Sequence, residues 1–256
     1  MQGIEVSGQG PIVLFFHSSL SSAKQWHFLA KQLSQSYTCI NVDMYGYGKA
    51  PQAPDLDPFS FNIEIARLAP LFKEVIQDRP FHIVGHSCGG ALALKLATLH
   101  AEKVLSLSLF EPVAFHLLPQ DSEEAAISNQ FSQQLLSLDN VQAARTFTDF
   151  WNRKGFFDGL PQKLQIAMSE DMNKVRLDSQ SLNGETYGVA ELSEIAAPVL
   201  LMKGSNSPHL SRFLVDHIAS MFDEASVEEL PGGHMAPLDN PVPVFNAVTE
   251  HIKKAS

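Results

Sequence analysis

Cysteine, clusters of basic residues and long apolar runs are scarce or absent in this sequence of 256 residues. Its two cysteines, Cys39 and Cys88, are too few for a disulfide scaffold or for a structural site with four metal ligands. No apolar run reaches the roughly 18 residues of a membrane span. Residues 1–10 also lack the basic start and the apolar core of a signal peptide. We therefore expect a cytoplasmic protein without a membrane partner.

The charge distribution excludes a further class of partner. The chain has 28 acidic and 18 basic residues, which gives a net charge of −10, and no block of lysine or arginine occurs. Nucleic-acid binding needs a basic surface, so we expect none. The composition, 45% hydrophobic and 18% charged, is that of a globular chain, and the length suits one large domain with an insertion. A small-molecule substrate is the expected partner, and the sequence indicates no particular oligomeric state.

Short apolar runs alternate with amphipathic stretches at both ends of the chain. Such alternation is typical of a parallel sheet covered by helices. The expected strands are 11–16, 37–42, 81–84, 104–110, 198–202 and 225–230. The expected helices between and after them are 23–34, 61–78, 91–100, 210–221 and 243–253.

The segment 112–195 has a different character, with no β-rich run and three amphipathic stretches at 123–138, 141–151 and 160–177. The sequence therefore predicts an α/β fold with a mostly parallel, doubly wound sheet. Residues 1–111 and 196–256 would form this core, and residues 112–195 would form a helical cap inserted into it.

A sharp strand-to-helix turn is predicted at Gly85-His86-Ser87-Cys88-Gly89, which fits the pattern G-x-S-x-G. Such a turn lifts a serine hydroxyl above the sheet at a helix N-terminus, which favours developing negative charge. Ser87 is therefore the candidate nucleophile. Cys88 is the competing candidate, but a cysteine beside the turn is more often a packed core residue.

His234 is the candidate general base, because it follows the last strand in a loop and an imidazole titrates near neutral pH. Of the other histidines, His82 and His86 flank the turn and are expected to pack in the interior. His100, His217 and His251 lie on predicted helices, and we expect them to be solvated.

Together these motifs resemble the α/β-hydrolase family, and the resemblance covers nearly the whole chain. It includes His17-Ser18-Ser19, Asp43-Met44-Tyr45-Gly46-Tyr47-Gly48, the turn at Ser87 and Gly233-His234. The resemblance implies that the backbone N–H groups of Ser19 and Cys88 form an oxyanion hole, although the family usually has His-Gly at the position of His17-Ser18. It also implies that Asp43 is structural. Because a Ser-His-acid site needs only water as a co-reactant, we expect no cofactor.

The acid of the expected triad departs from the family pattern. Most members carry an Asp at the position that Ser207 occupies in Gly204-Ser205-Asn206-Ser207. Glu111, at the end of the strand 104–110, is the strongest substitute, because some dehalogenases of the same fold carry their acid there. Asp239 or an Asp of the cap remains an alternative, as does weak support of His234 by Ser207 or Asn206.

The cap aromatics Trp151, Phe156 and Phe157 are the candidates for contact with a substrate. We predict a serine hydrolase that cleaves a small to medium, apolar ester or thioester through an acyl-enzyme. One alternative is a C–C bond hydrolase or a perhydrolase with the same triad. Another is a receptor-like ligand binder with slow or no catalysis, which the missing Asp would favour. Acidic residues at the start of the helix 123–138 have no partnering histidines, so we expect no metal site.

Overall fold

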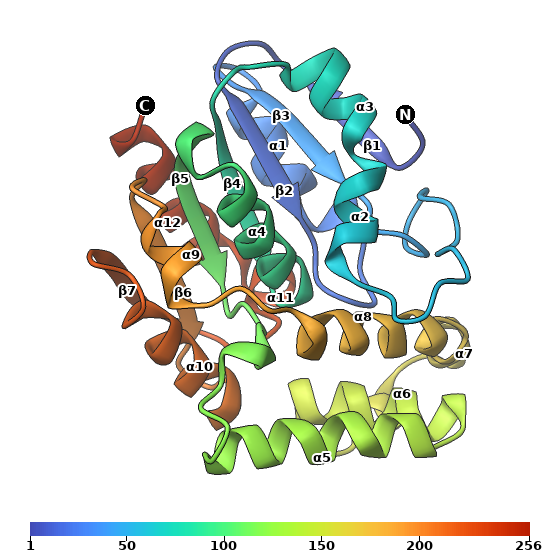
Figure 1. Ribbon diagram of the computed structural model, residues 1–256. Helices are drawn as coiled ribbons and strands as arrows, with labels where there is room; N and C mark the ends of the chain where they lie inside the picture. The colour runs from blue at the N-terminus through green and yellow to red at the C-terminus, as the bar shows by residue number, and fades with distance from the viewer.

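The apolar runs form one sheet, which the computed structural model of residues 1–256 shows at the centre of the molecule (Figure 1). Its seven strands lie in the order β1-β3-β2-β4-β5-β6-β7. They are β1 (Ile4–Ser7), β2 (Ile12–Phe16), β3 (Thr38–Val42), β4 (Phe81–His86), β5 (Val104–Phe110), β6 (Val199–Gly204) and β7 (Ala225–Leu230). Strands β2 to β7 are parallel, and β1 pairs antiparallel with β3. The predicted α/β fold class is confirmed.

Strand β1 lies in the segment from which the sequence predicted no element. Ile4 is half-buried and the other three residues of β1 are exposed, because this edge strand has only β3 as a neighbour. Backbone hydrogen bonds stabilise such a strand without an apolar face, so periodicity gives no signal for it. The other edge strand, β7, has the same exposed character.

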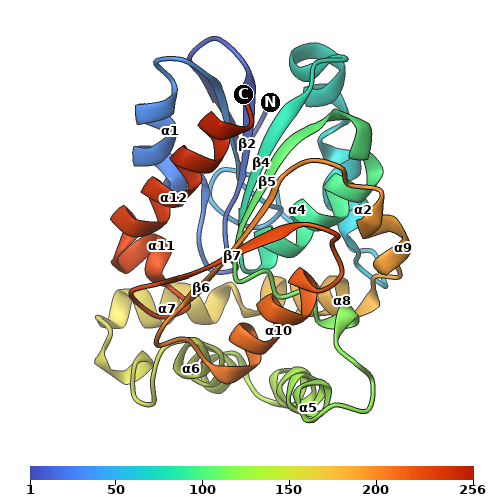
Figure 2. The same ribbon diagram turned by 90° about the vertical axis from the view of Figure 1, so that its left-hand side faces the viewer.

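Helices cover both faces of the sheet, as Figure 2 shows edge-on. One face packs against η1 (Ala23–Trp26), α1 (His27–Leu33), α11 (Ala236–Asp239) and α12 (Pro241–Lys254). The other face carries α2 (Phe61–Arg67), α3 (Ala69–Leu71), η2 (Phe72–Ile76), α4 (Cys88–Leu99), η3 (Ala101–Lys103) and α10 (His209–Ala219). Two hydrophobic clusters, one on each face, hold these layers together because the central strands are buried on both sides.

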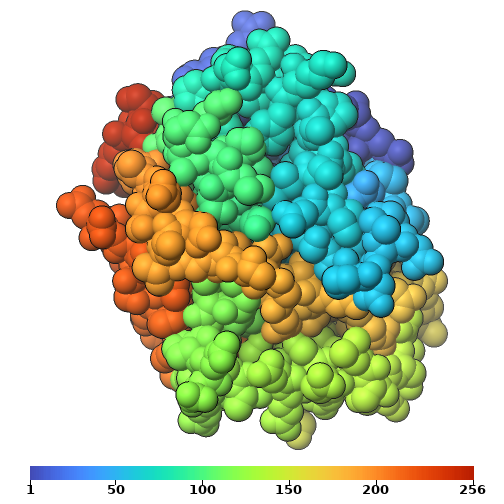
Figure 3. Space-filling view, viewed as in Figure 1, coloured from blue at the N-terminus to red at the C-terminus, as the bar shows by residue number.

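Between β5 and β6 the chain forms helices only. They are η4 (Phe115–Leu117), α5 (Glu123–Ser137), α6 (Asn140–Trp151), η5 (Phe157–Gly159), α7 (Gln162–Glu170), α8 (Met172–Gly184) and α9 (Val189–Ser193). We use "cap" for α5 to α8, which lie across the lower edge of the sheet, whereas α9 lies level with the strands (Figures 1 and 2). In the space-filling view the cap forms a continuous lower surface against the core (Figure 3).

The single helix predicted over 160–177 is wrong. The structure has two helices there, α7 and α8, which meet at Asp171, and α8 continues to Gly184. The buried face of α8 includes the charged residues Lys174 and Asp178, so an apolar pattern does not reveal its extent.

The parallel arrangement has one consequence for function. The carboxyl ends of β2, β4, β5, β6 and β7 meet at one edge of the sheet, which is the edge that the cap covers (Figure 1). Ligands of open α/β sheets bind at this edge. None of the helices combines the length and the apolar character that a transmembrane segment requires.

Gly89, in the first turn of α4, gives a test of this packing. A Cβ atom on Gly89 would overlap the carbonyl group of His17, whereas one on Gly184 would have no neighbour within 4 Å. We expect Gly89→Ala to lower the free energy of unfolding by about 1–3 kcal/mol, because the overlap forces the backbone to shift. Gly184→Ala is the control and should not destabilise the protein. Urea denaturation of both variants measures the effect, and equal midpoints would contradict it.

Candidate active site

Ser87 lies at the turn between β4 and α4, in a backbone conformation that residues other than glycine rarely adopt. Its φ is 55° and its ψ is −121°. The turn is held because the Ser87 N–H donates to the carbonyl of Phe110 (3.0 Å) and the Ala91 N–H donates to the carbonyl of Ser87 (3.0 Å). Only glycine fits at Gly85, where β4 touches α4, and at Gly89, where α4 touches Phe16 and His17 at the end of β2.

His234 lies in the loop after β7, and its ring joins two side chains. Its Nε2 atom is 2.9 Å from Ser87 Oγ, and its Nδ1 atom is 2.6 Å from Glu111 Oε2. Because a carboxylate can only accept, Nδ1 carries the proton and Nε2 accepts the hydrogen bond from the serine hydroxyl. All three side chains are buried, with exposed fractions of 6% or less.

Glu111 follows β5 directly, and its φ of 43° turns the side chain towards the loops after β6 and β7. Its second oxygen, Oε1, accepts a hydrogen bond from the Gly204 N–H (2.7 Å). Burial raises the pKa of Glu111, but the hydrogen bond and charge of His234 and the Gly204 N–H outweigh it, so the pKa lies below its ordinary value. The carboxylate is therefore charged at neutral pH.

The other candidates for the acid do not contact the His234 ring. Ser207 is buried near Glu111, where it favours the charged carboxylate, but its hydroxyl makes no hydrogen bond of normal geometry. Asn206 makes no side-chain hydrogen bond to His234, and Asp239 is exposed at the cavity rim. The structure thus brings Glu111, of all the carboxylates considered, to the imidazole.

The N–H groups of Ser19 and Cys88 are free to bind a ligand. Neither amide donates to another group of the protein, and both residues border a small cavity beside Ser87. The loop that carries Ser19 is fixed on the core side, since His17 Nε2 accepts from the Met44 N–H (3.0 Å) and the Ser18 N–H donates to Gln25 Oε1 (3.1 Å). Paired free N–H groups next to a nucleophile can stabilise an oxyanion.

Cys88 does not act as a nucleophile in this arrangement. Its side chain lies in the hydrophobic core with 1% exposure, and burial raises the pKa of its thiol well above the ordinary value. A thiol that stays protonated is a poor nucleophile.

His86 does more than fill the interior. It is fully buried as expected, but its Nε2 donates to the carbonyl of His234 (2.8 Å) and its Nδ1 accepts from Gln25 Nε2 (3.0 Å). Gln25 in turn accepts from the Ser18 N–H. This chain links the backbone of His234 to the loop of Ser19, and no sequence pattern indicated it.

The expectation that the histidines on helices are solvated is wrong. His251 is half-buried against the sheet, with Nδ1 2.8 Å from Ser108 Oγ, and His100 stacks on Phe72 with ring centres 4.8 Å apart. His217 donates to the carbonyl of Leu117 (3.0 Å). His217 and His251 lie on α10 and α12, and His100 directly follows α4. Their exposure depends on tertiary packing, which the sequence pattern of one helix does not show.

A cavity of about 290 Å³ opens in front of Ser87 and His234. Trp151 and Phe156, two of the three predicted contact residues, border it, and the Trp151 ring stacks on the His234 ring with centres 4.2 Å apart. The other apolar residues of the wall are Leu20, Phe147, Met168, Met235 and Leu238. The wall is thus mostly apolar, and its one carboxylate, Asp239, lies at the exposed rim.

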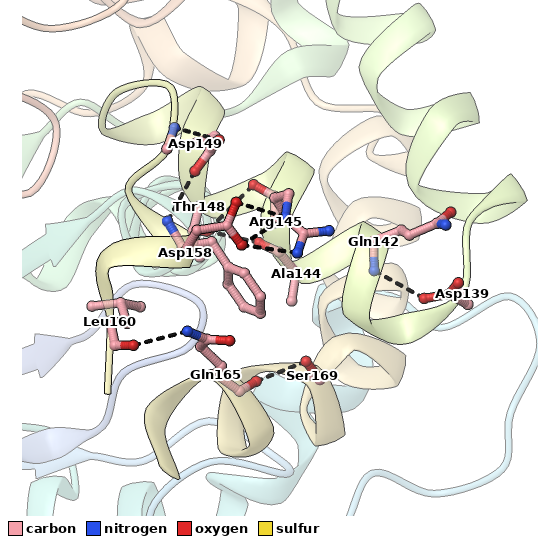
Figure 4. Close-up of polar contacts among 12 residues, drawn as sticks. Asp139, Gln142, Ala144, Arg145, Thr148, Asp149, Asp158, Leu160, Gln165 and Ser169 are labelled. Atoms are coloured by element: carbon pink, nitrogen blue, oxygen red, sulfur yellow. Dashed lines mark hydrogen bonds and ion pairs between the residues drawn. The ribbon is translucent and has the colours of Figure 1, made fainter. Parts of the chain in front are cut away.

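Phe157 does not face this cavity, contrary to the expectation. Gly155, with a φ of 79°, reverses the chain, and Asp149 accepts hydrogen bonds from the N–H groups of Gly155 (2.8 Å) and Phe157 (3.0 Å). The ring of Phe157 is therefore buried inside the cap, beneath Arg145, whose guanidinium pairs with Asp158 (Figure 4). Phe156 and Phe157 follow one another in a helical turn, where successive side chains point roughly 100–120° apart, and of the two Phe156 borders the cavity.

Two further observations concern a contact of the cap that the sequence did not predict and the question of a metal site. Asp178 of α8 reaches the loop of Ser19 from the cap and pairs with Lys174 on the same helix; the spacing of four residues between these opposite charges was the available signal. No group of three or more His, Cys, Asp or Glu side chains converges in an arrangement that suits a metal ion.

With this geometry in view, comparison with known proteins defines the class. A family model described as the alpha/beta hydrolase family matches residues 13–248. The chain therefore belongs to the alpha/beta hydrolase family, and the resemblance seen in the motifs is confirmed.

Individual relatives are more distant. The chain is 31% identical over 116 residues to a fluoroacetate dehalogenase from Burkholderia sp, which is 44% of this chain and 38% of that protein. It is 25% identical to the esterase YbfF from Escherichia coli over 94% of this chain and 92% of the esterase. The matches to the first three curated relatives span only 38% to 53% of those proteins. The enol-lactonase from Burkholderia xenovorans LB400 has the same fold, with a TM-score of 0.78 at 15% identity over 98% of this chain and 96% of the lactonase.

His17 makes the stability of this site dependent on pH. Burial lowers the pKa of His17 to about 4, so the ring is neutral in the folded protein but gains a proton near pH 6.5 when the chain unfolds. The unfolded state then binds more protons between these values, and we expect the free energy of unfolding to fall as the pH drops from 6.5 towards 4. Urea denaturation at several pH values measures this. A constant free energy over this interval would contradict the burial of a neutral His17.

Proposed function

We propose that the protein is a serine hydrolase that cleaves small to medium, apolar carboxylic esters or thioesters through an acyl-enzyme. The observation that carries the proposal is the continuous hydrogen-bonded chain from Ser87 Oγ through His234 to Glu111. This chain leads into an apolar cavity and lies beside two free backbone N–H groups. These are the parts that acyl transfer requires.

In the proposed reaction, Ser87 Oγ attacks the carbonyl carbon while its proton passes to His234 Nε2. Glu111 stabilises the imidazolium that forms, and the N–H groups of Ser19 and Cys88 bind the oxyanion. The tetrahedral intermediate then expels the alcohol or thiol, which takes the proton from His234. A water molecule, deprotonated by His234, attacks the acyl-serine and releases the carboxylic acid.

The identity of the nucleophile argues against the reaction that the names of two relatives suggest, dehalogenation. Displacement of a halide by Ser87 would give an alkyl ether, which has no carbonyl group for a second attack by water. The enzyme would stop after one turnover. A serine is suited to carbonyl substrates, as the name of the esterase YbfF also suggests. Glu111 supplies the charge whose absence would have favoured a receptor-like binder.

Labelling with a fluorophosphonate tests the proposal, because the probe reacts with a serine that a general base activates. We expect rapid labelling of Ser87 in the wild type and none in Ser87→Ala. Glu111→Gln should fold normally but lower the labelling rate and kcat by a factor of about 10²–10⁴, because the imidazolium loses its counter-charge. Peptide mapping and an ester screen measure these effects.

The same experiment separates the alternatives. A folded wild type that neither labels nor cleaves any ester of the screen would contradict the serine hydrolase. An unchanged labelling rate in Glu111→Gln would agree with a serine hydrolase but would show that Glu111 is not its acid. Labelling without ester cleavage would direct the screen to C–C bond hydrolysis or perhydrolysis, which use the same three residues.

The length of the acyl chain should follow the wall of the cavity. Met168 on α7 borders the cavity, whereas Leu164 on the same helix is exposed. We expect Met168→Ala to shift the optimum among p-nitrophenyl esters towards longer acyl chains, because it adds apolar volume where the substrate binds. Leu164→Ala is the matched control and should leave the profile unchanged. Identical profiles for Met168→Ala and the wild type would place the acyl chain elsewhere.

A further inference from the structure

Three charged side chains are buried together where the cap meets the core. Lys174 and Asp178 lie on α8 and Glu64 lies on α2, with exposed fractions of 6%, 2% and 2%. Lys174 Nζ pairs with Asp178 and, at 3.2 Å, with Glu64. Burying such charges costs several kcal/mol each unless they are paired and hydrogen-bonded. A cluster of this kind therefore calls for a reason beyond stability.

Asp178 is the member that reaches the active site. It borders the small cavity beside Ser87, and its Oδ2 atom accepts hydrogen bonds from Ser19 Oγ (2.6 Å) and Tyr47 Oη (2.7 Å). Its other oxygen, Oδ1, accepts from Lys174 Nζ. Three donors thus surround one carboxylate and leave it no freedom to turn.

The protonation states in the cluster agree with these directions. Burial and the Asp178 carboxylate raise the pKa of Tyr47 well above its ordinary value, so the phenol donates. Burial lowers the pKa of Lys174, but the carboxylates of Asp178 and Glu64 outweigh it and hold the pKa above the ordinary value. Lys174 is therefore a cation, held between the carboxyl groups of Asp178 and Glu64.

Ser19 needs an anchor on the cap side. Its neighbours His17 and Ser18 are held by hydrogen bonds from or to the core, whereas the side chain of Ser19 bonds only to Asp178. The next residue, Leu20, has a φ of 57°, a conformation that costs about 1 kcal/mol or more for a residue with a side chain. Without the bond to Asp178 the loop could relax, and the N–H of Ser19 would move.

We propose that Asp178 is a positioning residue, which holds the Ser19 hydroxyl so that the Ser19 N–H points at the oxyanion. The proposal rests on the proposed function, since it assigns a role within the acyl transfer. Because Asp178 belongs to the cap helix α8, the oxyanion hole is complete only when the cap is docked on the core. Lys174 and Glu64 hold the carboxylate in place.

Asp178→Asn and Ser19→Ala test this role, alone and combined. An amide in place of the carboxylate disturbs the bond from Ser19, and the alanine removes it while keeping the backbone N–H. We expect each single variant to lower kcat for p-nitrophenyl butyrate about 10- to 100-fold with KM within about twofold, less than the loss of a whole donor. The kcat of the double variant should lie within about threefold of that of the slower single variant, because both substitutions act on the same hydrogen bond.

A tetrahedral analogue supplies the readout that a general loss of structure would not give. The inhibition constant of a trifluoromethyl ketone should rise by the same factor as kcat/KM falls, whereas that of butyrate, a ground-state ligand, should stay within about twofold. Ser181→Ala is the control, because Ser181 joins the same helix to the core through the carbonyl of Phe59 (3.4 Å) without touching Ser19. It should keep kcat within about threefold.

Several results would overturn the proposal. One is a fall in kcat in the double variant that equals the product of the two single effects. The others are a rise in KM with unchanged kcat in a single variant, or a fall in kcat in Ser181→Ala as large as that in Asp178→Asn. If Asp178→Asn does not fold, Ser19→Ala provides the test. An unchanged kcat in Ser19→Ala overturns the proposal, and a fall in kcat together with an equal rise in the inhibition constant of the ketone supports it. A wild type without labelling or ester cleavage would instead refute the proposed function.

Discussion

The buried hydrogen bond between Glu111 and His234 is the constraint on which the site depends. A charged carboxylate is tolerated in the interior because three groups stabilise it, namely the imidazole N–H, the Gly204 N–H and the Ser207 hydroxyl. These partners come from the end of β6 and from the loops after β6 and β7. The register of the parallel sheet therefore sets the position of the acid, and the acid sets the tautomer of the base.

Neighbouring strands divide this work between them. Strand β4 ends at the turn that presents Ser87, β5 ends at Glu111, β6 supplies Gly204, and the loop after β7 carries His234. Ser87 and Glu111 both adopt positive φ values, so the backbone is strained at the proposed nucleophile and at the proposed acid. Such strain persists only where surrounding structure holds it, and here the strands β4 and β5 pair without interruption from His82 and Ser106 to His86 and Phe110.

The core could be predicted from sequence because its signals are local. Buried parallel strands are continuous apolar runs, the turn at Ser87 needs its glycines, and both can be recognised without tertiary information. The acid was harder, since Ser207 occupies the usual position and only the setting of Glu111 at a strand end pointed to it. The sequence did not predict strand β1, the break at Asp171 or the orientation of Phe157. These features depend on residues distant in sequence or on hydrogen bonds in a turn, and hydrophobic periodicity does not reveal either.

The cap contributes polar and apolar groups that the sequence analysis did not separate. Trp151 stacks on the ring of His234, while Asp178 reaches the loop of Ser19. Both contacts join cap helices to loops of the core. The aromatic residues drew attention because they are large and apolar, whereas the four-residue spacing of Lys174 and Asp178 is equally typical of an exposed ion pair and does not show that the pair is buried.

The most direct test of the account is proton NMR of the His234 ring in protein with ¹⁵N-labelled histidine. A short hydrogen bond to a buried carboxylate moves the Nδ1 proton far downfield of the backbone amides. The account predicts such a resonance in the wild type and in Ser87→Ala, and its loss in Glu111→Gln. Its absence from the wild type, or its persistence in Glu111→Gln, would show that Glu111 does not hold the base and would contradict the central claim.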